Sequence, residues 1–191
     1  MAKVVVKSKV KKAKRKFPVE IKAPEYLNSM TLGHSEVSDL SSLIGKTSKI
    51  NMMYVSGNVK NQNVRLTFKI IEASSGLAKT TVKVYEQIPY YLRRHVKKGS
   101  DLIESSFDVV SKDGIALKVK PFAVTKANIS SLVSSSVRAK IEELISQDAS
   151  EKTADEFVSS VISGKIQTVF RNELKKITPM KSFEFRRVEL A

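Results

Sequence analysis

Positively charged side chains are the residues of this chain best suited to contact a partner. The 191 residues include 34 Lys and Arg against 19 Asp and Glu, which gives a formal net charge of +15. A surplus this large repels itself unless a polyanion neutralises it, so nucleic acid and anionic membranes are the candidate partners. No apolar run is long enough to cross a membrane. We therefore expect a nucleic-acid partner and no membrane.

The cations form four groups in the sequence. Binding a nucleic acid requires cations that meet phosphates at several places on a frame that fixes their positions. Any one group is more simply a solvated surface, but four groups beside this net charge predict an interface. The candidate RNA-binding residues are Lys3, Lys7, Lys9, Lys11, Lys12, Lys14, Arg15 and Lys16; Arg93, Arg94, His95, Lys97 and Lys98; Lys112, Lys118 and Lys120; and Arg171, Lys175, Lys176, Lys181, Arg186 and Arg187.

The first group makes residues 1–16 a basic N-terminal tail. It holds eight cations, and no acid occurs before Glu20. Like charges at this density resist compaction, so we expect the tail to be disordered until it binds. Two other interpretations are a solvated charge run without a partner and a nuclear import signal.

Enzymatic chemistry finds little support. The chain has no cysteine and only two histidines, His34 and His95. A Ser/His/Asp triad or a metal site needs an imidazole next to further ligands or a buried acid, and neither histidine has such a setting. Residues 45–47 (Gly-Lys-Thr) end like a P-loop, but Leu40 stands where its first glycine belongs. We expect no enzyme, no cofactor and no metal.

Aromatic residues are few, at 7%, and there is no tryptophan. This argues against a single-strand binder that grips bases by stacking and favours recognition of the backbone and shape of structured RNA. The phenylalanines interpreted as core residues are Phe17, Phe68, Phe107, Phe157, Phe170, Phe183 and Phe185.

Alternation and helical spacing predict the elements that position these groups. Strands are expected at 19–23, 50–54, 64–70 and 78–84, with a loop over 25–47. A short basic helix is expected over 88–98, with Pro89 in its first turn and Gly99 at its end. A hairpin follows, with strands at 103–109 and 115–119 joined by a turn at 112–114.

The C-terminal part predicts three helices and a last strand. Helical spacing runs over 129–145, and Thr153 with Glu156 forms a capping box before a second helix. A third helix ends at Pro179. The strand at 181–190 changes phase after Phe185, which indicates a bulge. The fold class is α+β: an antiparallel β-barrel-like core of five to seven strands in a single domain, 17–191, with the short basic helix inserted and three C-terminal helices.

Several of these segments together resemble the ribosomal protein S-three-A-e family, the e-type S-one protein of the archaeal and eukaryotic small ribosomal subunit. The similarity covers about 17–190 and is most specific over 91–125. Its segments are Phe17 with 21–24 (Ile-Lys-Ala-Pro), 43–47 (Leu-Ile-Gly-Lys-Thr), 66–70 (Leu-Thr-Phe-Lys-Ile), 92–99 (Leu-Arg-Arg-His-Val-Lys-Lys-Gly), 107–110 (Phe-Asp-Val-Val), 112–114 (Lys-Asp-Gly), 117–121 (Leu-Lys-Val-Lys-Pro), 122–125 (Phe-Ala-Val-Thr) and 175–179 (Lys-Lys-Ile-Thr-Pro).

The resemblance implies a structural constituent of the small ribosomal subunit that supports translation in the cytoplasm. It implies binding of small-subunit rRNA at the platform, near the mRNA exit and the 3′ end of the rRNA. Neighbouring platform proteins, and mRNA near the exit, are the further partners implied. A β-barrel-like core with packed helices is the fold implied.

Two alternatives follow from the same residues. A free-standing RNA-binding protein or RNA chaperone would use the same charge but bind RNA promiscuously. A nuclease-type enzyme would need carboxylates that converge on divalent metal ions. The nearest cluster in sequence is Asp101, Glu104 and Asp108, which is more simply a solvated edge.

Overall fold

A computed structural model describes residues 15–74 and 76–190. The predicted disorder of the tail and its six lysines from Lys3 to Lys14 therefore lie outside the described residues. Arg15 and Lys16 are described, and both are exposed just before the first strand.

The described ranges contain nine strands, five α-helices and three short 3-10 helices. The strands are β1 (Phe17–Lys22), β2 (Thr31–Val37), β3 (Thr47–Asn51), β4 (Val64–Ser74), β5 (Leu77–Gln87), β6 (Leu102–Glu104), β7 (Phe107–Val110), β8 (Ala116–Thr125) and β9 (Met180–Leu190). The helices are α1 (Met52–Ser56), α2 (Pro89–His95), α3 (Ser131–Glu151), α4 (Ala154–Ser163) and α5 (Lys165–Leu174), and the 3-10 helices are η1 (Glu25–Leu27), η2 (Leu40–Ser42) and η3 (Val59–Asn63).

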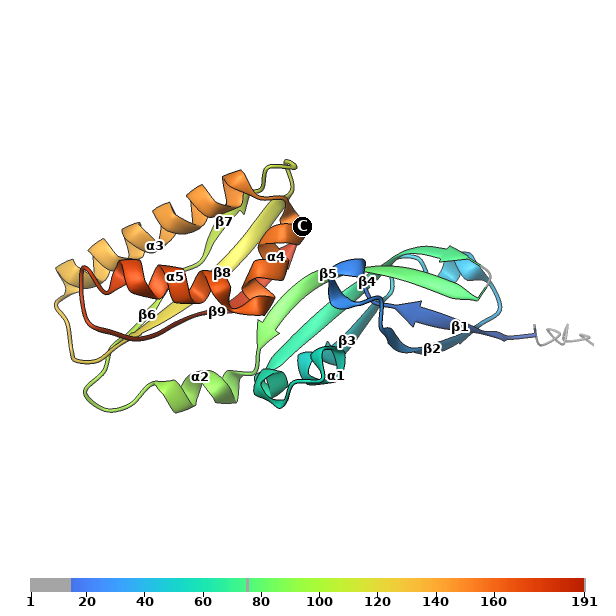
Figure 1. Cartoon of the computed structure of the whole chain (residues 1–191), viewed down its shortest axis with the longest axis horizontal. Helices are drawn as coiled ribbons and strands as arrows, with labels where there is room; N and C mark the ends of the chain where they lie inside the picture. The colour runs from blue at the N-terminus through green and yellow to red at the C-terminus, as the bar shows by residue number, and fades with distance from the viewer. Residues whose placement is uncertain (1–14, 75, 191) are drawn as a thin grey trace, which may run out of the picture.

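The strands form one open, mixed sheet, so the prediction of an antiparallel barrel-like core of five to seven strands is not confirmed. The path through the sheet is β2-β1-β5-β9-β8-β6, with β3 and β4 joined to β5, and β7 joined to β8. One edge of β5 pairs in parallel with β1 at Leu77–Lys79 and antiparallel with β9 at Val84–Glu86. The sheet therefore extends lengthwise instead of curling closed, and the molecule is elongated (Figure 1). The α+β class is confirmed.

Two sequence predictions near the N-terminus are wrong. The expected loop at 25–47 contains β2, which pairs antiparallel with β1 from Phe17↔Val37 onward. Most β2 side chains are at least partly exposed, so the strand lacks the apolar alternation that would reveal it. The strand expected at 50–54 stops at Asn51. Its side chain accepts a hydrogen bond from the Met53 N–H at 2.9 Å and begins α1 there.

Two boundaries further along also differ. Residues 103–109 form two strands, β6 and β7, instead of one, and both pair with β8. The helix α2 ends at His95, four residues before Gly99.

Local signals near the C-terminus place their features correctly. In the capping box of α4, the Glu156 N–H donates to Thr153 Oγ1 at 3.3 Å, and the Thr153 N–H donates to Glu156 Oε2 at 3.0 Å. The predicted bulge is confirmed. Phe185 lies opposite Pro121 and Arg187 opposite Lys120, which leaves Arg186 as the extra residue of β9.

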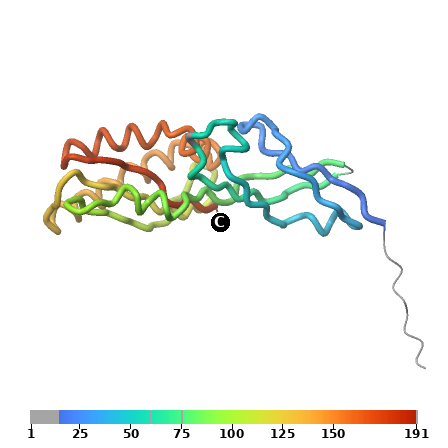
Figure 2. Tube along the Cα trace, turned by 90° about the horizontal axis from the view of Figure 1, so that it is seen from below, coloured from blue at the N-terminus to red at the C-terminus, as the bar shows by residue number. Residues whose placement is uncertain are grey.

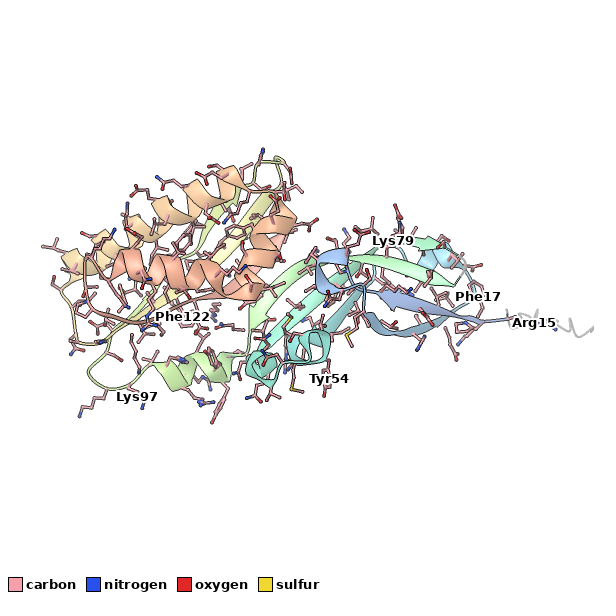
Figure 3. All side chains as sticks on the ribbon, viewed as in Figure 1. Arg15, Phe17, Tyr54, Lys79, Lys97 and Phe122 are labelled. Carbon is pink, nitrogen blue, oxygen red and sulfur yellow. The ribbon has the colours of Figure 1, made fainter. Side chains whose placement is uncertain are left out.

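The core lies mainly between the helices α3–α5 and one face of β8 and β9 (Figure 1). Phe157, Phe170, Phe183 and Phe185 pack there edge to face, with ring centroids 5.5 to 6.2 Å apart. Phe17, which was assigned to the core, is 36% exposed because it lies at the start of β1, at one end of the molecule (Figure 3). On the opposite face of β8, Phe122 and Val124 pack against Leu92 of α2.

Candidate nucleic-acid interface

The short helix α2 is fixed to the sheet by its apolar side and by one lysine. Leu92, with Val96 just after the helix, packs on Phe122 and Val124 of β8, and Phe122 is fully buried beneath them (Figure 3). Pro89 at the first position suits a helix start because its missing N–H would have no partner there. At the other end, Lys181 Nζ donates to the main-chain oxygen of His95 at 2.9 Å.

This attachment directs a set of cations to solvent. Arg93, Arg94, Lys97 and Lys98 are all exposed, and no ion pair among the described residues involves any of them. Lys97 projects from the end of the molecule (Figure 3). We call these four residues the α2 cations. Four uncompensated charges on a fixed element are the arrangement that phosphate binding needs.

His95, predicted with the α2 cations, has a different setting. It is half-buried, and its ring lies against Tyr91 with centroids 4.4 Å apart. Tyr91 in turn donates from its hydroxyl to Glu184 Oε1 at 2.9 Å. Burial, followed by the nearby Glu184 carboxylate, raises the pKa of Tyr91 to about 12. His95 therefore belongs to the base of the helix, and its main-chain oxygen serves to hold the helix in place.

The predicted cations of β8 and β9 lie on the same side of the sheet as α2, but acidic residues lie among them. These β8–β9 cations are Lys118, Lys120, Arg186 and Arg187. Lys118 pairs across the strands with Glu189. Arg187 contacts Glu189 at 2.9 Å and Arg186 contacts Glu104 at 3.2 Å. The two arginines of this part of the face are therefore paired with acids, which weakens its attraction for phosphates.

One side chain of this strand pair meets the α2 cations. Arg186 and Arg93 line the same shallow pocket, together with Leu102. Lys120 of β8 lies opposite Arg187 of β9, the residue that follows Arg186. The third and fourth sequence groups thus approach the α2 cations on this face at this border.

The remaining predicted residues lie elsewhere. Lys112 is in the β7–β8 turn, where its N–H donates to the Lys152 oxygen at 3.1 Å. Arg171, Lys175 and Lys176 belong to α5 and its end, in the helix layer on the opposite face of the sheet. Lys176 is paired with Glu173 at 2.6 Å, and the half-buried Lys181 is engaged with α2. The four groups therefore do not form one continuous surface.

One end of the molecule gathers cations from three loops. The loops that follow α2, β8 and α5 all lie at that end in both views (Figures 1 and 2). A hydrogen bond of 2.9 Å from the Lys126 N–H to the Pro179 oxygen ties two of them together. Arg15 lies at the opposite end (Figure 3). The loops after β8 and α5 carry Lys126, Lys175 and Lys176, all exposed, which we call the loop cations; Lys97 and Lys98 of the α2 cations lie in the third loop.

Lys126 and two tyrosines were missed by the sequence analysis. Tyr54 on α1 and Tyr90 on α2 are each 67% exposed. Tyr54 was assigned to a strand face, and Lys126 stands alone outside any basic run. Tyr90 precedes the α2 cations by only three residues, so an aromatic surface suited to base stacking lies beside them.

None of the helices between residues 15 and 190 is both long and apolar enough to cross a membrane. No cluster of three or more His, Asp or Glu side chains within the described residues is arranged to hold a metal ion.

The chain is similar to known proteins over most of its length. The model of the Ribosomal S3Ae family matches residues 5–191. A protein of Desulfurococcus amylolyticus is 31% identical over 94% of this chain and 84% of its own length, and one of Methanobrevibacter smithii is 29% identical over 96% of both chains. A protein of Haloarcula marismortui is 26% identical over 94% of this chain and 84% of its own. All three are named small ribosomal subunit protein eS1.

Proposed function

The chain belongs to the Ribosomal S3Ae family, and from this membership we propose that it is a structural constituent of the small ribosomal subunit that binds rRNA. The names of its relatives support the ribosomal role, and they support a non-enzymatic protein that works in translation. This agrees with the family expected from the residues over 17–190.

The α2 cations are the observation that carries the rRNA-binding part of the proposal. Leu92 and Lys181 hold the helix on the sheet, so the main chain that carries the α2 cations is in place before any partner arrives. Preorganised charges lose little conformational freedom on binding. Each phosphate they neutralise releases counterions, which makes the slope of log K against log salt more negative by about 0.7 to 0.9.

We propose that the basic residues outside α2 add affinity at separate contacts. Arg15 lies at the end of the folded part opposite the loop cations, so the tail cations, from Lys3 to Lys16, would meet a different stretch of rRNA. The β8–β9 residues Lys118, Lys120, Arg186 and Arg187 would contribute less, because Glu104 and Glu189 neutralise the two arginines locally. Residues 17–191 would act as one unit, since β5 belongs to both halves of the sheet.

The location within the subunit is a finer proposal. The block at 91–125 supports binding at the platform, near the mRNA exit and the 3′ end of the rRNA. Neighbouring platform proteins, and mRNA at the exit, would be the further partners, on ribosomes of the cytoplasm.

Sedimentation of a native extract tests the proposal. The extract is washed at moderate salt and separated on a gradient that resolves the two subunits. We expect the protein in stoichiometric amount with the small subunit. A protein that stays at the top of the gradient at every salt concentration, and binds rRNA and random RNA equally, would be a free RNA chaperone instead.

A further inference from the structure

A polar cavity lies between η3, β4 and β5 on one side and α4, α5 and β9 on the other. Its volume is about 320 Å³, and β5, η3, α2, β9 and the turn between α4 and α5 all contribute to its wall. Small-molecule sites typically occupy about 300 to 1,000 Å³, so the size suits a ligand. Polar side chains that line it include Asn63, Gln87, Tyr91, Gln167, Arg171 and Glu184.

Several polar atoms in this wall lack a partner. Among the described residues, Gln87 Oε1, Gln167 Oε1, Ser182 Oγ and Arg171 Nε are buried without a hydrogen bond. Gln87 is only 5% exposed. A buried polar group that loses water and gains no partner costs stability, so four of them around one cavity call for an occupant.

The neighbouring hydrogen bonds fix which atoms remain available. The Nε2 atom of Gln87 donates to Glu184 Oε2, and that of Gln167 donates to the Val161 oxygen at 2.8 Å. Each amide nitrogen donates one hydrogen bond there, and each amide oxygen, which has no partner, is left as an acceptor. The Glu184 carboxylate, which also accepts from Tyr91, is a third acceptor group in the same wall.

The other side of the cavity is electropositive. Helix α5 begins at Gly164, which lines the cavity, and no side chain of the described residues caps its first N–H groups. Arg171 lies seven residues after Gly164, on the same face of the helix. A helix N-terminus and a guanidinium together attract an anion, above all a phosphate.

We propose that this cavity binds a guanosine nucleotide extruded from RNA. The inference rests on the proposed RNA-binding function and adds a base-reading site to it. Guanine presents two adjacent donors, N1–H and N2–H, on its Watson–Crick edge, which match the acceptors of Gln87, Gln167 and Glu184. The phosphate meets Arg171 and the start of α5, and Tyr85 and Tyr91 also line the cavity. Proteins read unstacked RNA bases by such contacts.

Nucleotide titrations of the full-length, isotope-labelled protein test the site. We expect GMP to shift the side-chain amide resonances of Gln87 and Gln167 in NMR spectra. GMP should bind about tenfold more tightly than AMP, because adenine lacks the paired donors. Unshifted cavity resonances, or equal affinity for the two nucleotides, would overturn the proposal and leave a cavity that holds water.

A matched pair of variants separates the site from general charge. Arg171→Gln should weaken GMP binding about tenfold, whereas Arg138→Gln removes an exposed guanidinium from α3, which does not line the cavity, and should change it less than about twofold. Equal effects would contradict the site. If Arg171→Gln fails to fold, the GMP and AMP titrations of the unaltered protein still test whether the cavity binds a guanosine nucleotide.

Failure of the site and failure of the proposed function give different results. An rRNA fragment that binds the protein while GMP leaves the cavity resonances unchanged overturns the nucleotide site alone. Selective GMP binding by a protein that never sediments with the small subunit supports the site and rejects the ribosomal role.

Discussion

Lys181 on β9 donates from Nζ to the main-chain oxygen of His95, 2.9 Å away, and joins the end of α2 to a strand 86 residues later in the chain. Its ammonium group is one of the predicted RNA-binding cations, yet it is half-buried and already engaged. A cation at a helix C-terminus satisfies a free carbonyl and interacts favourably with the helix dipole. Lys181 is thus a structural support for the α2 cations.

Replacing Lys181 by Met should loosen α2. The loss of a hydrogen bond to a charged group predicts a decrease of about 1.5 kcal/mol in the free energy of unfolding. Hydrogen exchange of the α2 amides should also accelerate. Urea denaturation and exchange measured by NMR check both effects. Lys175→Met, at an exposed position, is the control and should change stability by less than about 0.5 kcal/mol.

Removing the α2 cations should weaken rRNA binding without changing stability. In a variant with Ala at Arg93, Arg94, Lys97 and Lys98, the slope of log K against log salt should become less negative by roughly 3. Filter binding to a small-subunit rRNA fragment at several salt concentrations measures the slope, and thermal denaturation checks the fold.

The matched control removes four exposed cations from β4 and from the segment before and along β3. Alanine at Lys46, Lys49, Arg65 and Lys69 removes the same net charge. If this variant loses as much affinity as the α2 variant, binding depends on total charge and the α2 face is no special site.

Deleting residues 1–16 should weaken assembly and leave the rest folded. The first strand begins at Phe17, so the deletion removes no strand residue. If the tail meets about five phosphates, the deletion should make the slope of log K against log salt less negative by roughly 4 to 5. Sedimentation with the small subunit and thermal denaturation measure the two effects. A Gly/Ser tail of equal length controls for chain length, and an unfolded truncation would contradict the prediction.

Glu156 should make stability depend on pH in acid. Its main-chain and side-chain hydrogen bonds with Thr153 lower the pKa of its carboxyl below the ordinary value. A lowered pKa in the folded state gives stability that is complete above the unfolded pKa, about 4.3, and is lost as pH falls through the folded pKa. Glu156→Gln retains a capping side chain but cannot titrate.

Thermal denaturation between pH 3 and 6 measures this contribution. The melting temperature of the Glu156→Gln variant should fall less steeply on acidification than that of the unaltered protein. Glu142→Gln, on an exposed position of α3, should leave the slope unchanged. Identical slopes for all three proteins would show that the capping box contributes no pH dependence.

Features set by neighbouring residues could be predicted from the sequence. Thr153 and Glu156 are three residues apart, so their capping box needs no information from the rest of the chain. The bulge at Arg186 was visible because the apolar phase shifts between Phe185 and Val188. In both cases the signal and the structure lie within one turn or one strand.

Features set by distant pairings could not be predicted. Strand β2 exists because β1 offers it hydrogen bonds, and its own side chains give no apolar pattern. The engagement of Lys181 by His95, and the neutralisation of Arg186 by Glu104, join residues more than 80 positions apart. The cavity likewise joins Gln87 to Glu184. Sequence identifies the cations, but only the sheet pairing decides which of them remain free.

The continuity of β5 has a mechanical consequence. Its eleven residues extend over about 36 Å, and it is hydrogen-bonded to β1 near its start and to β9 near its end. Between these two ladders β5 is paired with β4. Bending the molecule at its middle would disturb this β4–β5 ladder, so the two charged ends keep nearly the same distance apart. During assembly of a ribonucleoprotein, the chain would behave as a spacer of set length that accepts two RNA segments only at one separation.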